Sequence, residues 1–287
     1  MCWTFKSVTQ SYGFTEGPVW DGNGMLFSDI PNDRILRYVP ETDTCSVCRE
    51  NTNAANGLKF SPSGDLYACE MSGRAVVRYG PDGGAVTIAD MYDGKRLNSP
   101  NDLAFDSQKR LWFTDPFYDD PWLEDHELEL DHRSVYRVDP SDLDSLQRMT
   151  LDTTNPNGLL VSPDDKQLYV AQSDYDGAKE LRAYPIEGDT LGPPEVLHDF
   201  GPHRGIDGMC LDTDGNIIAT AGWEKSGPGP LIYIFEPSGG VVETHHIADP
   251  KPTNCAFGED LQTLYVTGSE GRLYRARTDR TGYLGAP

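Results

Sequence analysis

The sequence predicts an all-β protein, a six-bladed β-propeller that forms a single domain over residues 1–287. Two observations predict this fold. One short unit recurs six times, at spacings of 40, 45, 56, 50 and 47 residues, and each copy holds three or four short apolar segments separated by turn residues. In addition, no stretch has a helical periodicity long enough to compete with strands.

The first strand of each unit follows an acidic or amide residue, and in four of the six copies a glycine comes next. A short apolar run then begins, as strands of a buried sheet require. The expected opening strands are 16–20, 56–60, 101–105, 157–161, 207–211 and 254–257.

The second and third strands follow turns that contain Ser, Pro, Asp or Gly. We expect second strands at 25–29, 66–70, 111–115, 168–172, 217–221 and 264–268, and third strands at 34–38, 75–79, 134–138, 180–184, 231–235 and 272–276.

A fourth, outer strand is visible in most units, for example at 86–89, 195–197 and 241–247. The sixth unit lacks one. Residues 2–8 have the pattern of a strand, and we expect them to supply the missing outer strand and so to close the ring.

The longest irregular insertion, residues 116–132, lies between the second and third strands of the third unit. It carries Trp122, Glu124, Asp125, Glu127 and Glu129. Two interpretations stay open, a lid over one face of the propeller and a solvated acidic loop.

The charge balance excludes some partners. Lys and Arg number 24 against 46 Asp and Glu, so the net charge is −22, which opposes binding to nucleic acid or to an anionic membrane surface. No apolar run approaches the roughly 18–20 residues of a membrane span, and the N-terminus lacks the pattern of a secretory signal. Six scattered cysteines fit a reducing compartment, so we expect a cytoplasmic protein. We expect a monomer, because a propeller closes its own sheet edges.

The residues that open the six units are expected to converge, because the first strand of every propeller blade lines the central channel. This set is Glu16, Asn56, Asn101, Asn157, Asp207 and Asn254. Two carboxylates and four amides are costly to bury without partners, and their oxygen atoms suit a hard cation such as Ca2+. An oxygen-only site also accepts Mg2+, Mn2+ or Zn2+ with altered geometry. Alternatively, the side chains cap turns and bond neighbouring backbone.

Four segments, 14–20, 96–102, 155–159 and 206–209, resemble the signature segments of the gluconolactonase and senescence-marker (regucalcin-like) family, and the resemblance covers essentially the whole chain. It implies a six-bladed propeller with one divalent metal ion in the channel. Carried over by position, the metal ligands are Glu16, Asn157 and Asp207, and Asn101 lies beside the metal, where it either ligates the ion or holds the substrate.

The resemblance also implies hydrolysis of a small sugar lactone, with the metal acting on the lactone carbonyl and Asp207 activating water. Related propellers hydrolyse organophosphates, and a non-catalytic propeller that binds calcium or a protein is a further alternative. The sequence argues against a covalent nucleophile, because it has no GxSxG motif and no Ser or Cys at a recognisable strand-to-helix turn near a His.

The chain departs from the family at one substrate contact. The regucalcin branch has an Arg two positions before the third-blade Asn, where this chain has Ser99; the nearest Arg is Arg96, which we expect to contact substrate instead. Further candidate substrate contacts are Asp115, Tyr118 and His203. Arg204 and Trp223 are weighed beside them, with turn or packing roles as the alternative.

Overall fold

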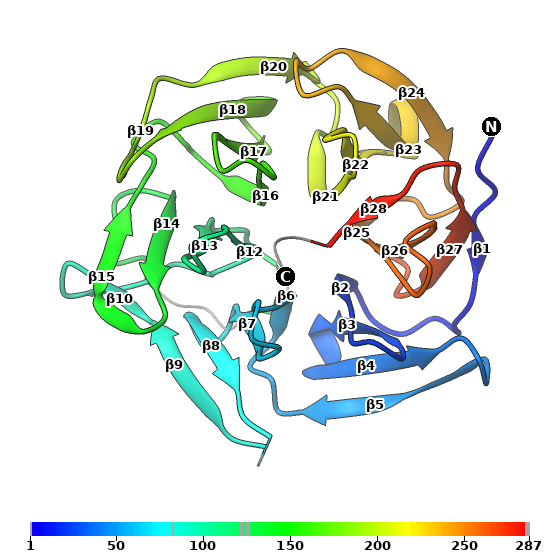
Figure 1. Cartoon of the computed structure of the whole chain (residues 1–287), viewed down its shortest axis with the longest axis horizontal. Coiled ribbons are helices and arrows are strands. Elements are labelled where there is room, and N and C mark those ends of the chain that lie inside the picture. Colours follow the sequence, from blue (N-terminus) through cyan, green and yellow to red (C-terminus); the bar gives the residue numbers. More distant parts are fainter. Residues whose placement is uncertain (1, 82, 121–122, 124–126, 285–287) are drawn as a thin grey trace.

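The computed structural model describes residues 2–81, 83–120, 123 and 127–284, and it confirms the predicted fold. Six antiparallel sheets stand around a central axis as the blades of a closed ring (Figure 1). Within the described ranges, no helix is long and apolar enough to cross a membrane.

Blades one to three contain every strand that the repeat predicts, with ends that differ by a few residues. Blade one has β2 (Thr15–Trp20), β3 (Met25–Asp29), β4 (Arg34–Val39) and β5 (Thr44–Glu50), blade two has β6 (Ala55–Phe60), β7 (Leu66–Glu70), β8 (Ala75–Tyr79) and β9 (Ala85–Ala89), and blade three has β12 (Leu103–Phe105), β13 (Leu111–Asp115), β14 (Ser134–Asp139) and β15 (Asp142–Arg148). A 3-10 turn, η1 (Ile30–Asn32), and a hairpin of β10 (Met91–Tyr92) and β11 (Lys95–Arg96) lie in the connections.

Blades four to six follow the same pattern with two added strands. Blade four has β16 (Pro156–Val161), β17 (Gln167–Ser173), β18 (Lys179–Glu187), β20 (Glu195–Asp199) and the short β19 (Thr190–Leu191), blade five has β21 (Ile206–Asp212), β22 (Ile217–Trp223), β23 (Ser226–Phe235), β24 (Val241–His246) and β28 (Gly282–Tyr283), and blade six has β25 (Pro252–Phe257), β26 (Thr263–Gly268), β27 (Leu273–Arg277) and β1 (Lys6–Ser7).

The N-terminal segment closes the ring, as predicted. β1 pairs antiparallel with β27, so the N-terminal strand completes the sheet of the sixth blade (Figure 1). The preceding Trp3 is only 2% exposed, stacks on His245 at a centroid distance of 4.0 Å and donates its indole N–H to Asp279. The first residues of the chain therefore tie blade six to blade five.

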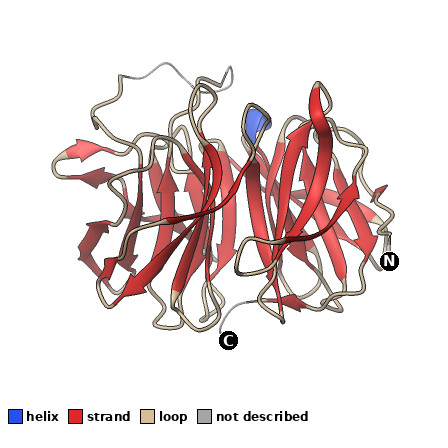
Figure 2. Ribbon diagram, turned by 90° about the horizontal axis from the view of Figure 1, so that it is seen from above, coloured by secondary structure: helices blue, strands red, loops and turns tan. Residues whose placement is uncertain are grey.

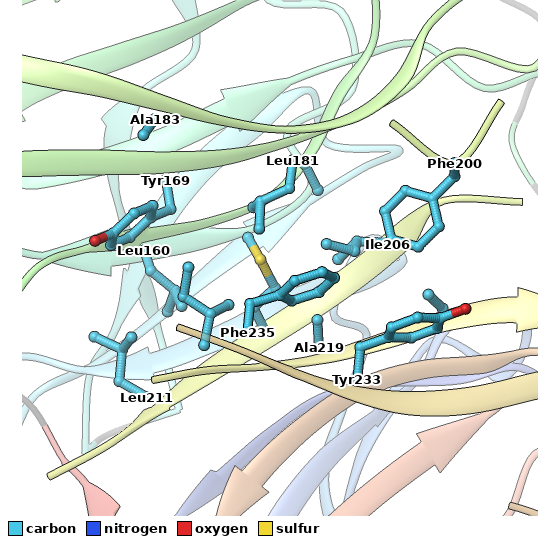
Figure 3. Close-up of a cluster of buried hydrophobic side chains, with 14 residues drawn as sticks. Leu160, Tyr169, Leu181, Ala183, Phe200, Ile206, Leu211, Ala219, Tyr233 and Phe235 are labelled. Carbon is cyan, nitrogen blue, oxygen red and sulfur yellow. The ribbon is translucent and has the colours of Figure 1, made fainter. Parts of the chain in front are cut away.

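Apolar side chains fill the spaces between neighbouring blades. Figure 3 shows the cluster between blades four and five, where Leu160 and Leu181 meet Ile206, Ala219 and Phe235. Strands such as β3 and β13 are buried along their whole length, because each middle strand has a neighbouring blade on both of its faces. This packing fixes where every inner strand begins.

The two faces of the ring differ. Seen from the side, η1 and the long loops stand on one face, and the C-terminus reaches the opposite face (Figure 2). There β28 pairs with the inner strand β21, a pairing that the repeat did not predict.

Candidate functional site

A pocket of about 370 Å³ opens at the end of the channel where the inner strands begin, on the face that carries η1. Five of the six residues that open the repeats line it, which confirms that this sequence position converges. They are Glu16, Asn56, Asn101, Asn157 and Asp207. The sixth, Asn254, hydrogen-bonds the Glu16 carboxylate and lines a separate cavity instead.

Glycine follows several of these residues because the inner strands approach one another closely. A Cβ on Gly57 would lie 2.7 Å from the carbonyl oxygen of Asn101 in the next blade, where an amide hydrogen bond of 2.8 Å already joins the two residues. A Cβ on Gly158 would likewise clash with the carbonyl oxygen of Asp207 in the next blade. Only glycine lets neighbouring strand starts come this close.

Glu16 and Asp207 place two carboxyl groups in the same pocket, where Glu16 is buried and Asp207 is half-buried. Glu16 is 4% exposed and its Oε2 accepts the Gly17 N–H at 2.7 Å. Burial raises the pKa of Glu16 well above its ordinary value, and the neighbouring charge of Asp207 raises it further. Burial also raises the pKa of Asp207, against the opposite effect of the Arg204 guanidinium. Both groups are costly to ionise without a nearby positive charge.

The amides add further oxygen atoms to the pocket. Asn157 hydrogen-bonds the Asp207 carboxylate, and the buried Asn56 Oδ1 has no hydrogen-bond partner among the residues that the structure describes. The residues described contain no group of three or more His, Cys, Asp or Glu side chains arranged to hold a metal ion. The predicted metal ligands are instead the two acids Glu16 and Asp207 with the amides Asn157 and Asn101, and carboxylate and amide oxygens are ligands that a hard cation such as Ca2+ accepts.

Arg204 holds the Asp207 side chain in place. Its guanidinium forms an ion pair with Asp207 and donates from the other nitrogen to the carbonyls of Gly222 and Pro252, at 2.9 and 3.1 Å. Asp207 is therefore fixed between the Asn157 amide and a guanidinium whose own position is set by β22 and β25.

Tyr118 lines the pocket, as predicted for a substrate contact, and its hydroxyl donates to the Ser173 carbonyl. Arg96, Asp115 and His203 do not line it. Arg96 donates to the Gly73 carbonyl at 2.7 Å, away from the pocket.

Asp115 is fully buried behind the pocket. Its two oxygens accept the backbone N–H groups of Asn98 and Ser99, at 2.9 and 2.8 Å. Asp115 thus fixes the turn that leads to Asn101, which is a positioning role for a residue that we expected to contact substrate.

The 116–132 insertion covers the same face. Tyr118 and Asp120 line the pocket, and Leu123 packs on the cluster of Ile30, Ala54 and Met71. Farther along, Glu129 forms an ion pair with Arg74 at 3.4 Å. Trp122, Glu124 and Asp125 of the insertion lie outside the described residues. The action of the insertion as a lid stays a prediction.

The sequence did not single out six of the polar lining residues: Asp120, Ser173, Tyr175, Lys179, Ser226 and Lys251. Trp223, for which the sequence left stacking and packing open, also lines the pocket. Neither a His nor a Cys is among the described lining residues, so a Ser beside a His base is not part of this site. The chemistry available is that of carboxylates, amides, hydroxyls and cations.

A second cavity, of about 310 Å³, lies at the other end of the inner strands. Its lining is mainly apolar and includes Trp20, Phe60 and Met209. We assign the functional site to the first pocket, because that pocket holds both convergent acids.

Comparison with known proteins agrees with this geometry. The family model described as "SMP-30/Gluconolactonase/LRE-like region" matches residues 14–270. The gluconolactonase of Zymomonas mobilis is 31% identical over 304 aligned residues, covering 96% of this chain and 81% of that protein. The diisopropyl-fluorophosphatase of Loligo vulgaris is 30% identical, covering 97% of this chain and 93% of that protein.

Among solved structures, a gluconolactonase from Xanthomonas campestris superimposes with a TM-score of 0.84 and 32% identity, covering 96% of this chain and 89% of that one. A match over nearly the whole chain, together with the shared six-bladed fold, establishes the family. The chain belongs to the SMP-30/gluconolactonase/LRE-like family.

Proposed function

We propose that the protein is a hydrolase that opens a small lactone of an aldonic acid. The observation that carries this proposal is the pair of neighbouring carboxyls, the buried Glu16 and the half-buried Asp207, set among amide oxygens in a 370 Å³ pocket. The similarity to two gluconolactonases supports the lactone as substrate.

A divalent cation, Ca2+ before Mg2+, Mn2+ or Zn2+, fits ligands from Glu16, Asn157 and Asp207, with Asn101 beside it. The buried and unpartnered Asn56 Oδ1 shows that the site has acceptor capacity to spare. When bound, such a cation supplies Lewis acidity toward a carbonyl oxygen and stabilises negative charge that develops there.

The chain's own residues supply positioning and proton transfer. Asp207, held by Arg204 and Asn157, accepts a proton from the water whose oxygen attacks the lactone carbonyl carbon. The ring C–O bond breaks, the leaving alkoxide takes up a proton to become a hydroxyl, and the product is a hydroxy acid. Tyr118 and Asn101 lie where they can orient the sugar ring.

A second candidate is hydrolysis of an organophosphate in the same pocket. The similarity to a diisopropyl-fluorophosphatase over nearly the full length of both chains favours it. Both reactions attack an electrophilic centre with water, so the residues that face the leaving group must separate the two substrates.

The proposal extends to the setting of the enzyme. All six cysteines are free, which is consistent with the predicted cytoplasmic location. In the closed ring the inner strands face the channel and only short outer strands expose an edge, which supports a monomer. The pocket and the net charge of −22 support action on a small molecule rather than on nucleic acid or membrane.

The test follows proton release, by a pH indicator, from a panel of sugar lactones, aliphatic lactones and organophosphates. We expect turnover of a sugar lactone that falls about 10²- to 10⁴-fold in Asp207→Asn, the range of a lost general base. Asp176→Asn, which removes the same charge from an exposed loop, is the matched control and should keep wild-type turnover. Full activity in a folded Asp207→Asn variant would contradict the proposal. Turnover of organophosphates without turnover of any lactone would favour the second candidate.

A further inference from the structure

One side of the pocket is built by the turns of blades five and six and carries its own chemistry. Trp223 ends β22, Ser226 begins β23 and Lys251 directly precedes β25, and all three side chains line the pocket. We call these three residues the cationic corner. Its residues come from blades five and six, whereas Glu16 and Asn101 belong to blades one and three.

The pocket contains three cationic side chains, and two of them are already engaged. Arg204 pairs with Asp207 and donates to two carbonyls. Lys179 donates its ammonium protons to the carbonyls of Tyr175 and Gly177, at 3.0 and 3.1 Å. The Lys251 ammonium has no hydrogen bond or ion pair to any residue that the structure describes, although its backbone N–H is bonded to Asp249.

The free ammonium is held in position by its surroundings. Its Nζ lies 4.8 Å from the centre of the Trp223 ring, and the Glu224 N–H donates to the Pro250 carbonyl at 3.0 Å, which joins the two turns. The fully buried Asp249 accepts the N–H groups of Lys251 and Ser269, both at 3.0 Å. The corner is therefore organised before any ligand arrives.

The polar groups of the corner have no hydrogen-bonded anion among the described residues. Ser226 Oγ is buried and has no hydrogen-bond partner in that part of the chain. Burial lowers the pKa of Lys251, and the nearby positive charges of Arg204 and Lys225 lower it further, against the carboxylates of Asp207 and Asp120. A hydroxyl and a partly desolvated ammonium that both lack a partner form a binding site for a negatively charged group.

We infer that the cationic corner binds a second, anionic group of the substrate, remote from the lactone carbonyl, so that the preferred substrate is an acidic lactone bearing a carboxylate, phosphate or sulfonate. Lys251 supplies the charge, Ser226 donates a hydrogen bond and Trp223 packs against the adjoining carbons. This inference rests on the proposed lactone hydrolysis and adds the class of substrate. A local cation is needed for it, since the protein as a whole carries a charge of −22 and repels anions.

The experiment compares kcat/KM for a neutral aldonolactone with kcat/KM for lactones of the same ring size that carry a carboxylate, a phosphate or a sulfonate on the terminal carbon. We expect the wild type to prefer at least one acidic lactone, and the identity of that lactone to show which anion the corner takes. In Lys251→Met the ratio of acidic to neutral kcat/KM should fall about 10- to 100-fold, mainly through KM, as expected for loss of one charge-assisted contact. Lys251→Arg should recover part of the ratio.

Lys225→Met is the matched control, because Lys225 lies over the same Trp223 ring at 5.4 Å but does not line the pocket. Its ratio should stay within about twofold of the wild type, since an exposed charge outside the pocket is largely screened. A wild type that prefers the neutral lactone, or an unchanged ratio in folded Lys251→Met, would overturn the inference and leave lactone hydrolysis intact. No turnover of any lactone would refute the proposed function and the inference together.

Discussion

Replacing Gly57 by alanine tests whether the close approach of the inner strands sets the geometry of the site. The added Cβ would lie 2.7 Å from the Asn101 carbonyl oxygen and 2.9 Å from the Asp102 Cα. Ordinary contacts of a Cβ begin near 3.4 Å, so the backbone of Asn101 must retreat by about 0.7 Å. Both obstacles are backbone atoms, which cannot rotate away.

Two effects should follow. Overpacking of this kind costs about 1–3 kcal/mol, and each kcal/mol lowers Tm by about 2–4 °C in a domain somewhat smaller than this one. The shift also displaces Asn101, and because a misplacement of about 1 Å can cost about 100-fold in rate, we expect kcat/KM to fall about 10- to 100-fold.

Thermal unfolding by circular dichroism and lactone hydrolysis well below Tm measure the two effects separately. Gly240→Ala is the control, because its nearest obstacle is the mobile carboxylate end of Glu236 at 3.2 Å. If Gly57→Ala keeps the Tm and kcat/KM of that control, the close-approach explanation of the repeated glycine is wrong. A lower Tm with unchanged kcat/KM would remove Asn101 from the site.

Two further predictions concern closure of the ring and the buried Asp115. Trp3→Ala should lose about 3–5 kcal/mol of stability, since it empties a 2% exposed site between blades five and six; a Tm equal to that of Lys6→Ala, on the exposed β1, would contradict a role in closure. Burial raises the pKa of Asp115 from 3.8 to about 7, so its neutral form is favoured in the fold and its contribution to stability is complete below about pH 3.8 and lost as the pH rises through 7. As the pH rises from about 4 to about 7, the Tm of Asp115→Asn should therefore fall less than the Tm of the wild type. An equal fall of Tm in the two proteins would contradict a titration of Asp115 in that window.

The fold was predictable because each repeat carries its own local signal. Turn residues and strands of five or six residues recur at nearly constant spacing, and the missing outer strand of the sixth unit pointed to residues 2–8. The pairing of β28 with β21 was not predictable, because two residues at the end of a chain carry no pattern that selects a partner strand.

The convergent residues of the pocket were predictable for the same reason, since one position of the repeat always lies within two residues of the start of an inner strand. Lys251 belongs to no repeated motif and reaches the pocket only because the turns of blades five and six are joined. Asp115 ends a second strand near the mouth, and only the folded backbone shows that the Asn98 and Ser99 N–H groups occupy both of its oxygens.

The most direct test of the account follows bound calcium and lactone turnover together while Ca2+ is titrated into chelator-stripped protein. We expect the wild type to bind one ion per chain in the pocket and to regain turnover in proportion to the ion bound. We also expect Glu16→Gln, which removes one of the two carboxyl groups of the pocket, to lose both binding and turnover while it stays folded. Full turnover in the stripped wild type, or unchanged binding and turnover in Glu16→Gln, would contradict the claim that a cation held by Glu16, Asn157 and Asp207 underlies the activity.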